Sequence, residues 1–179
     1  MLNTSDSSER LFFSLKFSAS QQKQLLPYQQ LLSQQFPTAK PVAVDNLHLT
    51  LFFLGQVTTA QKLHLLTAAQ SLTMPPFQLT LDTLAAFTKP KILYLSPFAV
   101  PAELRGLQQQ LAKICKAQGF NEIHDCYRPH VTLLRHVSVN ENFNRQIAPL
   151  PLVISEFALY QSVNIEGSVR YLPLHTFSG

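Results

Sequence analysis

The stretch Arg128–Arg135, RPHVTLLR, decides how this chain is interpreted. It has the pattern of a buried strand with a histidine at its start, and its phrase His-x-Thr-Leu occurs a second time as HLTL at residues 48–51. A single histidine at the mouth of an apolar strand is usually structural or exposed to solvent. Two copies in one chain of 179 residues, each after a predicted helix and loop, indicate a paired site instead.

The first copy of the motif has one polar face and one apolar face. Because side chains i and i+2 share a face of a strand, His48 and Thr50 point one way, and Leu49, Leu51 and Phe53 point the other. A histidine beside a hydroxyl places two hydrogen-bonding groups together, which suits a phosphoryl oxygen. We therefore expect a reactive face above a core face.

The second copy repeats this alternation and adds an arginine. His130 and Thr132 share the polar face, with Val131 and Leu133 beneath them. Arg135 is a candidate phosphate ligand, since a guanidinium binds phosphate well, but counting by two places it on the core face. Either the strand ends before Arg135 and the chain turns, or Arg135 is a solvated residue at a sheet edge.

The remaining chain alternates between apolar strand patterns and helical patterns. The predicted N-cap of the first helix is Ser20, and that of the second is Thr58 or Thr59. The third helix is predicted to end before Gly119, a C′ residue. The predicted helices cover about residues 20–36, 58–72 and 101–119, and the predicted strands cover 10–17, 48–55, 77–84, 91–97, 130–137, 152–162 and 169–177.

This order contains a coarse internal repeat. Strand, helix, loop and His-x-Thr strand occur in residues 10–54 and again in residues 91–137. The repeat favours an α+β fold with two lobes, in which two mainly antiparallel sheets are each backed by a helix. If a pseudo-twofold axis relates the lobes, His48 and His130 meet across a central cleft.

Composition and length limit the class of protein. We expect one two-lobed domain over residues 1–179, with residues 1–9 as a loose N-terminal tail. A net charge of +4 leans towards an anionic partner but carries little weight. The N-terminus has no apolar signal region and no run approaches the ~20 apolar residues of a membrane helix, so we expect no membrane association. Cys115 and Cys126 are then free thiols in a reducing cytoplasm.

Two histidines that face one cleft are suited to acid–base chemistry. An unperturbed pKa of ~6.5 leaves both protonation states accessible near neutral pH, so one imidazole acts as general acid and the other as general base. Cleavage of a phosphodiester needs this pair. The groups expected to stabilise the charge on phosphorus without a metal are Thr50, Thr132, a nearby arginine and backbone amides.

Other polar and aromatic candidates carry weaker signals. Four aromatic residues are more consistent with core positions than with base stacking: Phe12, Phe13, Phe52 and Tyr160. Four basic residues form either a rim or an ordinary solvated surface: Lys40, Lys89, Lys91 and Arg128. The other histidines, His64, His124, His136 and His175, lack the spacing of a metal site, and we expect neither metal nor cofactor.

The segments RLFFSL, KPVAVDNLHLTLFFLG, RPHVTLLR, FALYQS and RYLPL occur in this order between Arg10 and Leu174. Together they resemble the two-histidine (2H) phosphoesterase superfamily and, within it, the bacterial RNA 2′,3′-cyclic phosphodiesterases, historically called 2′-5′ RNA ligases. The resemblance implies a two-lobed fold and opening of an RNA 2′,3′-cyclic phosphate to a 2′-phosphomonoester, with no obligatory metal and no obligatory protein partner.

The resemblance also implies individual roles. His48 would protonate the leaving 3′ oxygen, His130 would activate water, and Thr50 and Thr132 would hold the phosphoryl oxygens. Arg135 matches an arginine that follows the second motif in bacterial members. Two other functions stay open: ATP-independent joining of RNA ends through a 2′-5′ linkage, and non-catalytic binding of RNA or nucleotides in which the histidines only contact phosphate.

Overall fold

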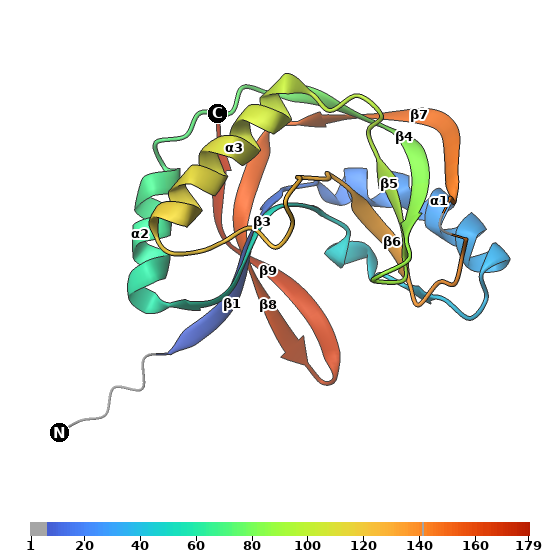
Figure 1. Ribbon diagram of the computed structural model, residues 1–179, viewed down its shortest axis with the longest axis horizontal. Helices are drawn as coiled ribbons and strands as arrows, with labels where there is room; N and C mark the ends of the chain where they lie inside the picture. Colours follow the sequence, from blue (N-terminus) through green and yellow to red (C-terminus); the bar gives the residue numbers. More distant parts are fainter. Residues whose placement is uncertain (1–6, 141) are drawn as a thin grey trace.

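The computed structural model describes residues 7–140 and 142–179 (Figure 1). In chain order, its elements are β1 (Ser8–Leu15), α1 (Ala19–Gln35), β2 (Lys40–Pro41), the 3-10 turn η1 (Val44–Asn46), β3 (Leu49–Thr58), α2 (Thr59–Ala69), β4 (Phe77–Phe87), β5 (Ile92–Ser96), α3 (Ala102–Ala117), β6 (Val131–Arg135), β7 (Asn144–Ile154), β8 (Glu156–Ile165) and β9 (Ser168–Ser178).

The strands form two antiparallel sheets. One has the order β3-β1-β8-β9 and the other has the order β2-β6-β5-β4-β7. Each sheet contains one motif strand, β3 or β6, and each motif strand pairs with the strand that opens its repeat, β1 or β5. The predicted α+β class and the two antiparallel sheets are therefore confirmed.

The helices are exchanged between the two repeats. The helix α1 follows β1 along the chain but packs against β6 of the other sheet, whereas α3 follows β5 and packs against β3. The helix α2 lies beside α3 and also contacts β3 (Figure 1). Each motif strand is thus backed by the helix of the opposite repeat.

The core is a cluster of buried apolar side chains that draws on both sheets and all three helices. The alternation predicted for the motif strands explains part of it, because Leu49, Val131 and Leu133 are fully buried. Replacing a buried leucine by alanine typically lowers the free energy of unfolding by about 2–5 kcal/mol. The motif backbones are therefore held from below by the core.

Helix boundaries differ slightly from the prediction. The N-cap of α1 is Ser18 and not Ser20, because Ser18 and Gln21 form a reciprocal capping box that starts the helix earlier in the chain. Thr58 and Gln61 form the same box at α2, which confirms Thr58 as its N-cap. Gly119 has φ of +89° directly after the C-cap of α3, as expected of a C′ glycine.

The strands at the two ends of the chain also depart from prediction. β1 begins at Ser8, so Ser8 and Glu9, which the sequence predicts to be in the loose tail, pair with β3. Residues 1–6 of that tail lie outside the described residues. The stretch 152–162 is divided between β7 and β8 at Ser155. β7 extends back to Asn144 despite Pro149 and Pro151, because it is an edge strand whose outer side needs no N–H donors.

Candidate active site

The first motif lies on β3, where two register shifts against β1 alter the simple alternation. Phe13 pairs with Phe52 and Ser14 pairs with Thr50, which leaves Leu51 as an extra residue in a β-bulge. His48 and Thr50 face a cleft as predicted. Phe53, for which strict alternation predicts the core face, also lines this cleft, because the bulge shifts the alternation by one residue.

The second motif lies at the start of β6 and has a matching irregularity. Leu93 pairs with Leu134 and Tyr94 pairs with Thr132, so Leu133 is the extra residue. Leu133 and Leu134 are consequently both buried, and Arg135 is exposed and lines the cleft with Thr132. The strand does not end before Arg135, and Arg135 is not at a sheet edge, because it pairs with both Lys40 and Ile92. The bulge returns its side chain to the polar face.

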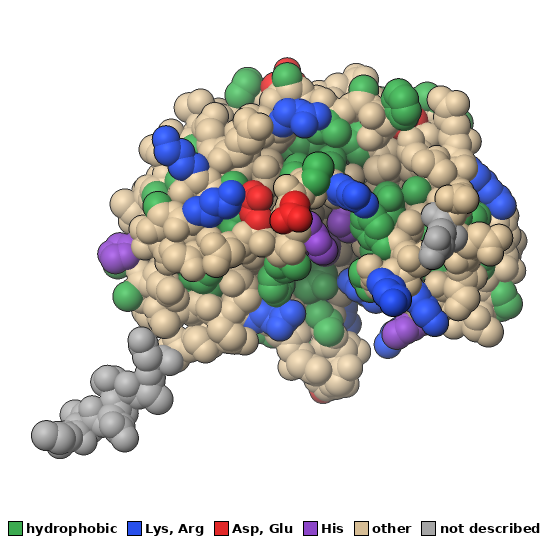
Figure 2. All heavy atoms as spheres, in the orientation of Figure 1, with side chains coloured by type: hydrophobic (Ala, Val, Ile, Leu, Met, Phe, Trp, Pro, Cys, Tyr) green, Lys and Arg blue, Asp and Glu red, His purple; other side chains and the backbone are tan. Residues whose placement is uncertain are grey.

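The two motifs meet in one cleft of about 990 Å³ between the sheets. It is lined by all five predicted site residues, His48, Thr50, His130, Thr132 and Arg135. Figure 2 shows histidine side chains in the central hollow of one face, with lysine and arginine side chains and a few acidic ones around its edge. The structure therefore brings together every residue that the sequence placed in the site.

Each motif histidine is restrained by a backbone carbonyl. His48 Nδ1 lies 2.7 Å from Asn46 O, and His130 Nδ1 lies 2.7 Å from Arg128 O. A carbonyl oxygen only accepts, so both Nδ1 atoms carry hydrogen and, in the neutral rings, both Nε2 atoms carry a lone pair. His48 Nε2 is 2.9 Å from Thr50 Oγ1, from which the neutral ring accepts a hydrogen bond.

Burial makes both histidines weaker bases than a free imidazole. The pKa of His48 is lowered from 6.5 to about 4, chiefly by desolvation; the hydrogen bond to Asn46 O opposes this shift, and the charges of His130 and Arg135 add to it. Desolvation likewise lowers the pKa of His130, with His124 and Arg135 acting in the same direction. Both rings are therefore neutral in the free protein at pH 7.

Aromatic rings hold the two imidazoles in place. The His48 ring packs against Phe12 and Tyr171, at centroid distances of 5.1 and 4.9 Å. The His130 ring lies 5.2 Å from the rings of both Phe87 and Tyr94. These contacts restrict ring rotation, so the Nε2 atoms keep a fixed direction.

The four aromatic candidates behave mostly as predicted. Phe13 and Phe52 are buried in the core. Phe12 is also buried but reaches the cleft beside His48, and Tyr160 stacks on Phe12 at 5.4 Å. These rings therefore pack within the protein, against His48 and the strands around it.

Basic side chains surround the motifs. Arg10, Lys40 and Arg135 line the cleft, and the Arg10 guanidinium lies 4.9 Å from the centre of the Phe53 ring. Among the described residues that line the cleft, none is Asp or Glu. This charge distribution attracts an anion. Of the other predicted rim residues, Lys89, Lys91 and Arg128 are exposed outside the cleft lining.

One structural residue of the site was not singled out from sequence. Asn46 is buried, and its Nδ2 donates to Val169 O at 2.8 Å while its Oδ1 accepts from Tyr171 N at 3.2 Å. It thereby connects the turn before the first motif to β9. The projecting β8–β9 hairpin, which forms one wall of the cleft, is visible in Figure 1. The sequence signal that could have identified Asn46 is its position two residues before the candidate histidine His48.

The described residues also limit which metal-binding or membrane-spanning features this part of the chain can contain. Within residues 7–140 and 142–179, no group of three or more His, Cys, Asp and Glu side chains is placed to hold a metal ion. No helix in the same residues is long and apolar enough to cross a membrane. Cys115 is buried and Cys126 is exposed, and both are free thiols.

Comparison with known proteins identifies close relatives in sequence. The chain is 32% identical over 168 residues to the RNA 2′,3′-cyclic phosphodiesterase of Escherichia coli (strain K12), which covers 93% of this chain and 94% of that protein. It is 28% identical over 99 residues to the RNA 2′,3′-cyclic phosphodiesterase of Aeropyrum pernix, which covers 54% of this chain and 56% of that protein.

Solved structures and a family model agree with this relationship. E. coli LigT complexed with 3′-AMP superimposes with a TM-score of 0.86 at 30% identity, covering 96% of this chain and 98% of that chain. TT0787 of Thermus thermophilus shares the fold, with a TM-score of 0.78 at 23% identity, covering 94% and 97%. A model of the 2′-5′ RNA ligase superfamily matches residues 20–165. With both His-x-Thr motifs facing one cleft, this chain belongs to the 2′-5′ RNA ligase superfamily.

Proposed function

We propose that this protein hydrolyses RNA 2′,3′-cyclic phosphate ends to 2′-phosphomonoesters, with His48 as general acid and His130 as general base. The observation that carries the proposal is the pair of motif histidines in one basic cleft, each with its Nδ1 bound to a backbone carbonyl. The likeness over most of the chain to an RNA 2′,3′-cyclic phosphodiesterase supports the same activity.

In the proposed reaction, the cyclic phosphate lies between the two imidazoles. His130 Nε2 removes a proton from water as the water oxygen attacks phosphorus. The P–O3′ bond breaks on the opposite side, and protonated His48 Nε2 gives its proton to the leaving 3′ oxygen. The product carries the phosphate on the 2′ oxygen, and proton exchange with solvent restores the starting state.

Thr50, Thr132 and Arg135 are proposed to bind the phosphate. Thr50 and Thr132 line the cleft beside their histidines, so their hydroxyls can donate to phosphoryl oxygens. Arg135 lies close enough to both imidazoles to lower the pKa of each. Its guanidinium is therefore suited to neutralising the charge that grows on phosphorus during attack.

The proposed acid needs a proton that the free protein does not hold at pH 7. His48, with a pKa of about 4, is neutral there. A bound phosphate anion favours the charged imidazolium and raises this pKa, so that a proton enters the site together with the substrate. Binding of the substrate and protonation of His48 are thereby coupled, so His48 stays neutral when the cleft holds only water.

Turnover of a defined oligonucleotide tests the proposal. An oligonucleotide ending in a 2′,3′-cyclic phosphate is incubated with the parent protein in EDTA, and the position of the product phosphate is identified. We expect hydrolysis to a 2′-phosphate. A 3′-phosphate product, or loss of activity that added divalent cation restores, contradicts the mechanism.

Including a 5′-hydroxyl RNA in the same assay separates the other two functions. A joined 2′-5′ product as the main species indicates end joining. Binding without any product, weakening strongly with salt, indicates a non-catalytic module.

A further inference from the structure

Two buried glutamines occupy matching positions behind the two motif strands. Gln29 lies on α1, and Gln108 lies on α3; their exposed fractions are 6% and 5%. A buried amide is costly unless its hydrogen bonds are satisfied, so the partners of these side chains carry information about why they are there.

Gln29 reaches the strand of the second motif. Its Nε2 donates to Leu133 O at 2.9 Å and to Val42 O at 2.8 Å, and Val42 N also donates to Leu133 O at 3.0 Å. Leu133 is the bulge residue of β6, three residues after His130. The amide of α1 therefore fixes the carbonyl at which the register of the second motif changes.

Gln108 makes the equivalent contact with the strand of the first motif. Its Nε2 donates to Leu51 O at 3.4 Å and to Glu122 Oε1 at 3.2 Å. Leu51 is the bulge residue of β3, three residues after His48. In both lobes, then, one N–H of a buried amide binds the carbonyl of the residue that forms the bulge.

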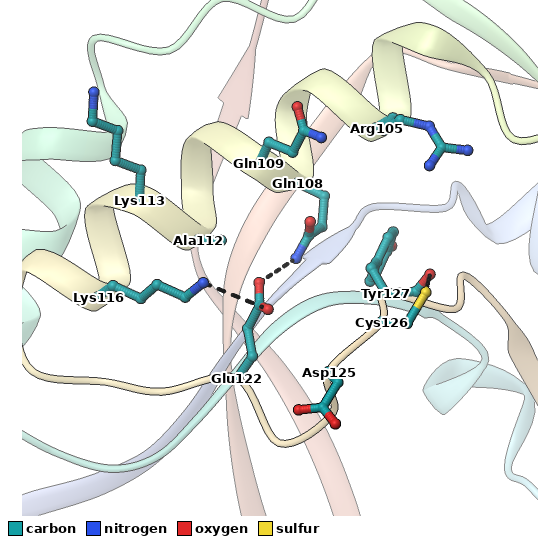
Figure 3. A pocket seen from close by; sticks show the side chains of 10 residues that line it. All are labelled: Arg105, Gln108, Gln109, Ala112, Lys113, Lys116, Glu122, Asp125, Cys126 and Tyr127. Atoms are coloured by element: carbon teal, nitrogen blue, oxygen red, sulfur yellow. Dashed lines mark hydrogen bonds and ion pairs between the residues drawn. The ribbon is translucent and has the colours of Figure 1, made fainter.

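Further contacts hold Gln108 and the first motif strand. Figure 3 shows Glu122 between Gln108 and Lys116, whose Nζ lies 3.6 Å from Glu122 Oε2. The carbonyl before Leu51 accepts from a side chain as well, since Tyr127 OH donates to Thr50 O at 2.9 Å. The carboxylate thus orients the amide, and the amide and the phenol fix two successive peptide groups of β3.

The bulges decide which side chains face the cleft. Without the bulge at Leu133, strict alternation would place Arg135 on the core face, below His130 and Thr132. Without the bulge at Leu51, it would place Phe53 in the core. A contact that fixes a bulge therefore fixes the direction of the polar groups on either side of it.

We propose that Gln29 and Gln108 are positioning residues that set the geometry of the reacting histidines, each acting on the motif of the opposite repeat. Gln29 acts on His130 and Arg135 through Leu133 O, and Gln108 acts on His48 through Leu51 O. The inference rests on the proposed function, because it assigns these residues a role in that reaction. In this proposal, the geometry of His130 depends on α1, and the geometry of His48 depends on α3.

Replacing each glutamine by methionine tests the proposal, because methionine keeps the length and removes the donors. The matched controls are Gln30→Met and Gln109→Met, which change the exposed neighbours on the same helices. Turnover of the cyclic-phosphate oligonucleotide gives kcat and KM, NMR titration follows each imidazole, and thermal melting reports folding. Gln29→Asn and Gln108→Asn, which only shorten the side chain, replace any methionine variant that fails to fold.

We expect kcat to fall about 10- to 100-fold in Gln29→Met and Gln108→Met, as for small misplacements of reacting groups, with the controls at the parent value. Gln29→Met should shift the titration of His130 and leave that of His48, and Gln108→Met should do the reverse. A lower melting temperature with unchanged kcat and unchanged titrations overturns the proposal, as do equal shifts of both histidines in both variants. A parent without turnover contradicts the proposed function alone, since the titrations need no substrate and still decide whether the glutamines position the histidines.

Discussion

His48 and His130 share one restraint: each donates its Nδ1–H to the carbonyl of the residue two positions earlier, over 2.7 Å in both cases. The two imidazoles come from different sheets, yet the same local geometry fixes the same tautomer in each. Both Nε2 atoms are therefore free of the backbone. A pair of equivalent nitrogen atoms can divide the roles of acid and base according to where the substrate's leaving oxygen lies.

The lowered histidine pKa values predict an acidic optimum for kcat/KM. This constant reports the free protein, in which the active form needs protonated His48, with a pKa of about 4, and neutral His130, whose pKa is also lowered. We expect kcat/KM to reach its maximum between about pH 4 and 6.5 and to fall above it. The measurement is a steady-state pH series at constant ionic strength.

The pH profile of kcat should lie at higher pH than that of kcat/KM, because bound phosphate stabilises the protonated imidazole. A kcat/KM that continues to rise through pH 8 would show that the charged form of His48 is not used.

Removal of the Arg135 charge should affect binding and both titrations. The guanidinium lowers the pKa of His48 and that of His130, so Arg135→Met should raise both pKa values. Loss of the guanidinium that binds the phosphate should lower kcat/KM by about 10-fold or more, in line with the ~1.5–3 kcal/mol typical of hydrogen bonds to charged groups. NMR titration and steady-state kinetics measure the two effects.

Arg105→Met is the control for this substitution, since Arg105 is exposed on α3 and lines a different cavity. Equal effects of the two variants would assign the change to net charge and not to a contact in the cleft.

A better leaving group distinguishes the acid from the base. If the 3′ oxygen is replaced by sulfur, the leaving thiolate needs little protonation, because a thiol has a pKa of ~8.5. The His48→Ala variant should therefore recover much of its activity on the sulfur substrate, whereas His130→Ala should not. Comparison of kcat/KM for both substrates and both variants gives the result. Recovery in His130→Ala alone would reverse the two roles.

The buried His48 should also make stability depend on pH. Its pKa in the folded protein, about 4, lies below the unfolded value of 6.5, so the unfolded chain binds more protons between these pH values. The contribution of His48 to stability is fully present above pH 6.5 and is lost as the pH falls through 4, by up to about 3 kcal/mol. His48→Gln should remove this part of the dependence in urea titrations.

His64→Gln, on the exposed side of α2, changes the same residue type away from the cleft and should follow the parent. Parallel pH dependences for the parent and His48→Gln would show that the folded protein does not hold His48 neutral.

Local sequence patterns predicted the site residues better than they predicted the register and ends of the strands. Alternation placed His130 and Thr132 on one face and Val131 beneath, and all three lie as predicted. Alternation could not place Arg135 and Phe53, because each follows a β-bulge. The carbonyl of each bulge residue accepts a hydrogen bond from a glutamine on a distant helix, Gln29 or Gln108. Such cross-lobe hydrogen bonds leave no periodic signal in the chain.

The first part of the edge strand β7, residues 144–151, lies outside the predicted strands for a similar reason. Pro149 and Pro151 argue against a strand unless its position in the sheet is known, and only tertiary structure places β7 at the edge. The sequence predicts Ser20 as the N-cap of α1, whereas the capping box between Ser18 and Gln21 starts the helix two residues earlier, before the apolar periodicity begins.

The most direct test of the central claim is turnover of an oligonucleotide ending in a 2′,3′-cyclic phosphate, in EDTA, by the parent protein, His48→Ala and His130→Ala. The account predicts a 2′-phosphate product from the parent and a loss of about 10²–10⁴-fold in each folded variant. Equal turnover by the parent and either folded variant would contradict the paired-histidine mechanism.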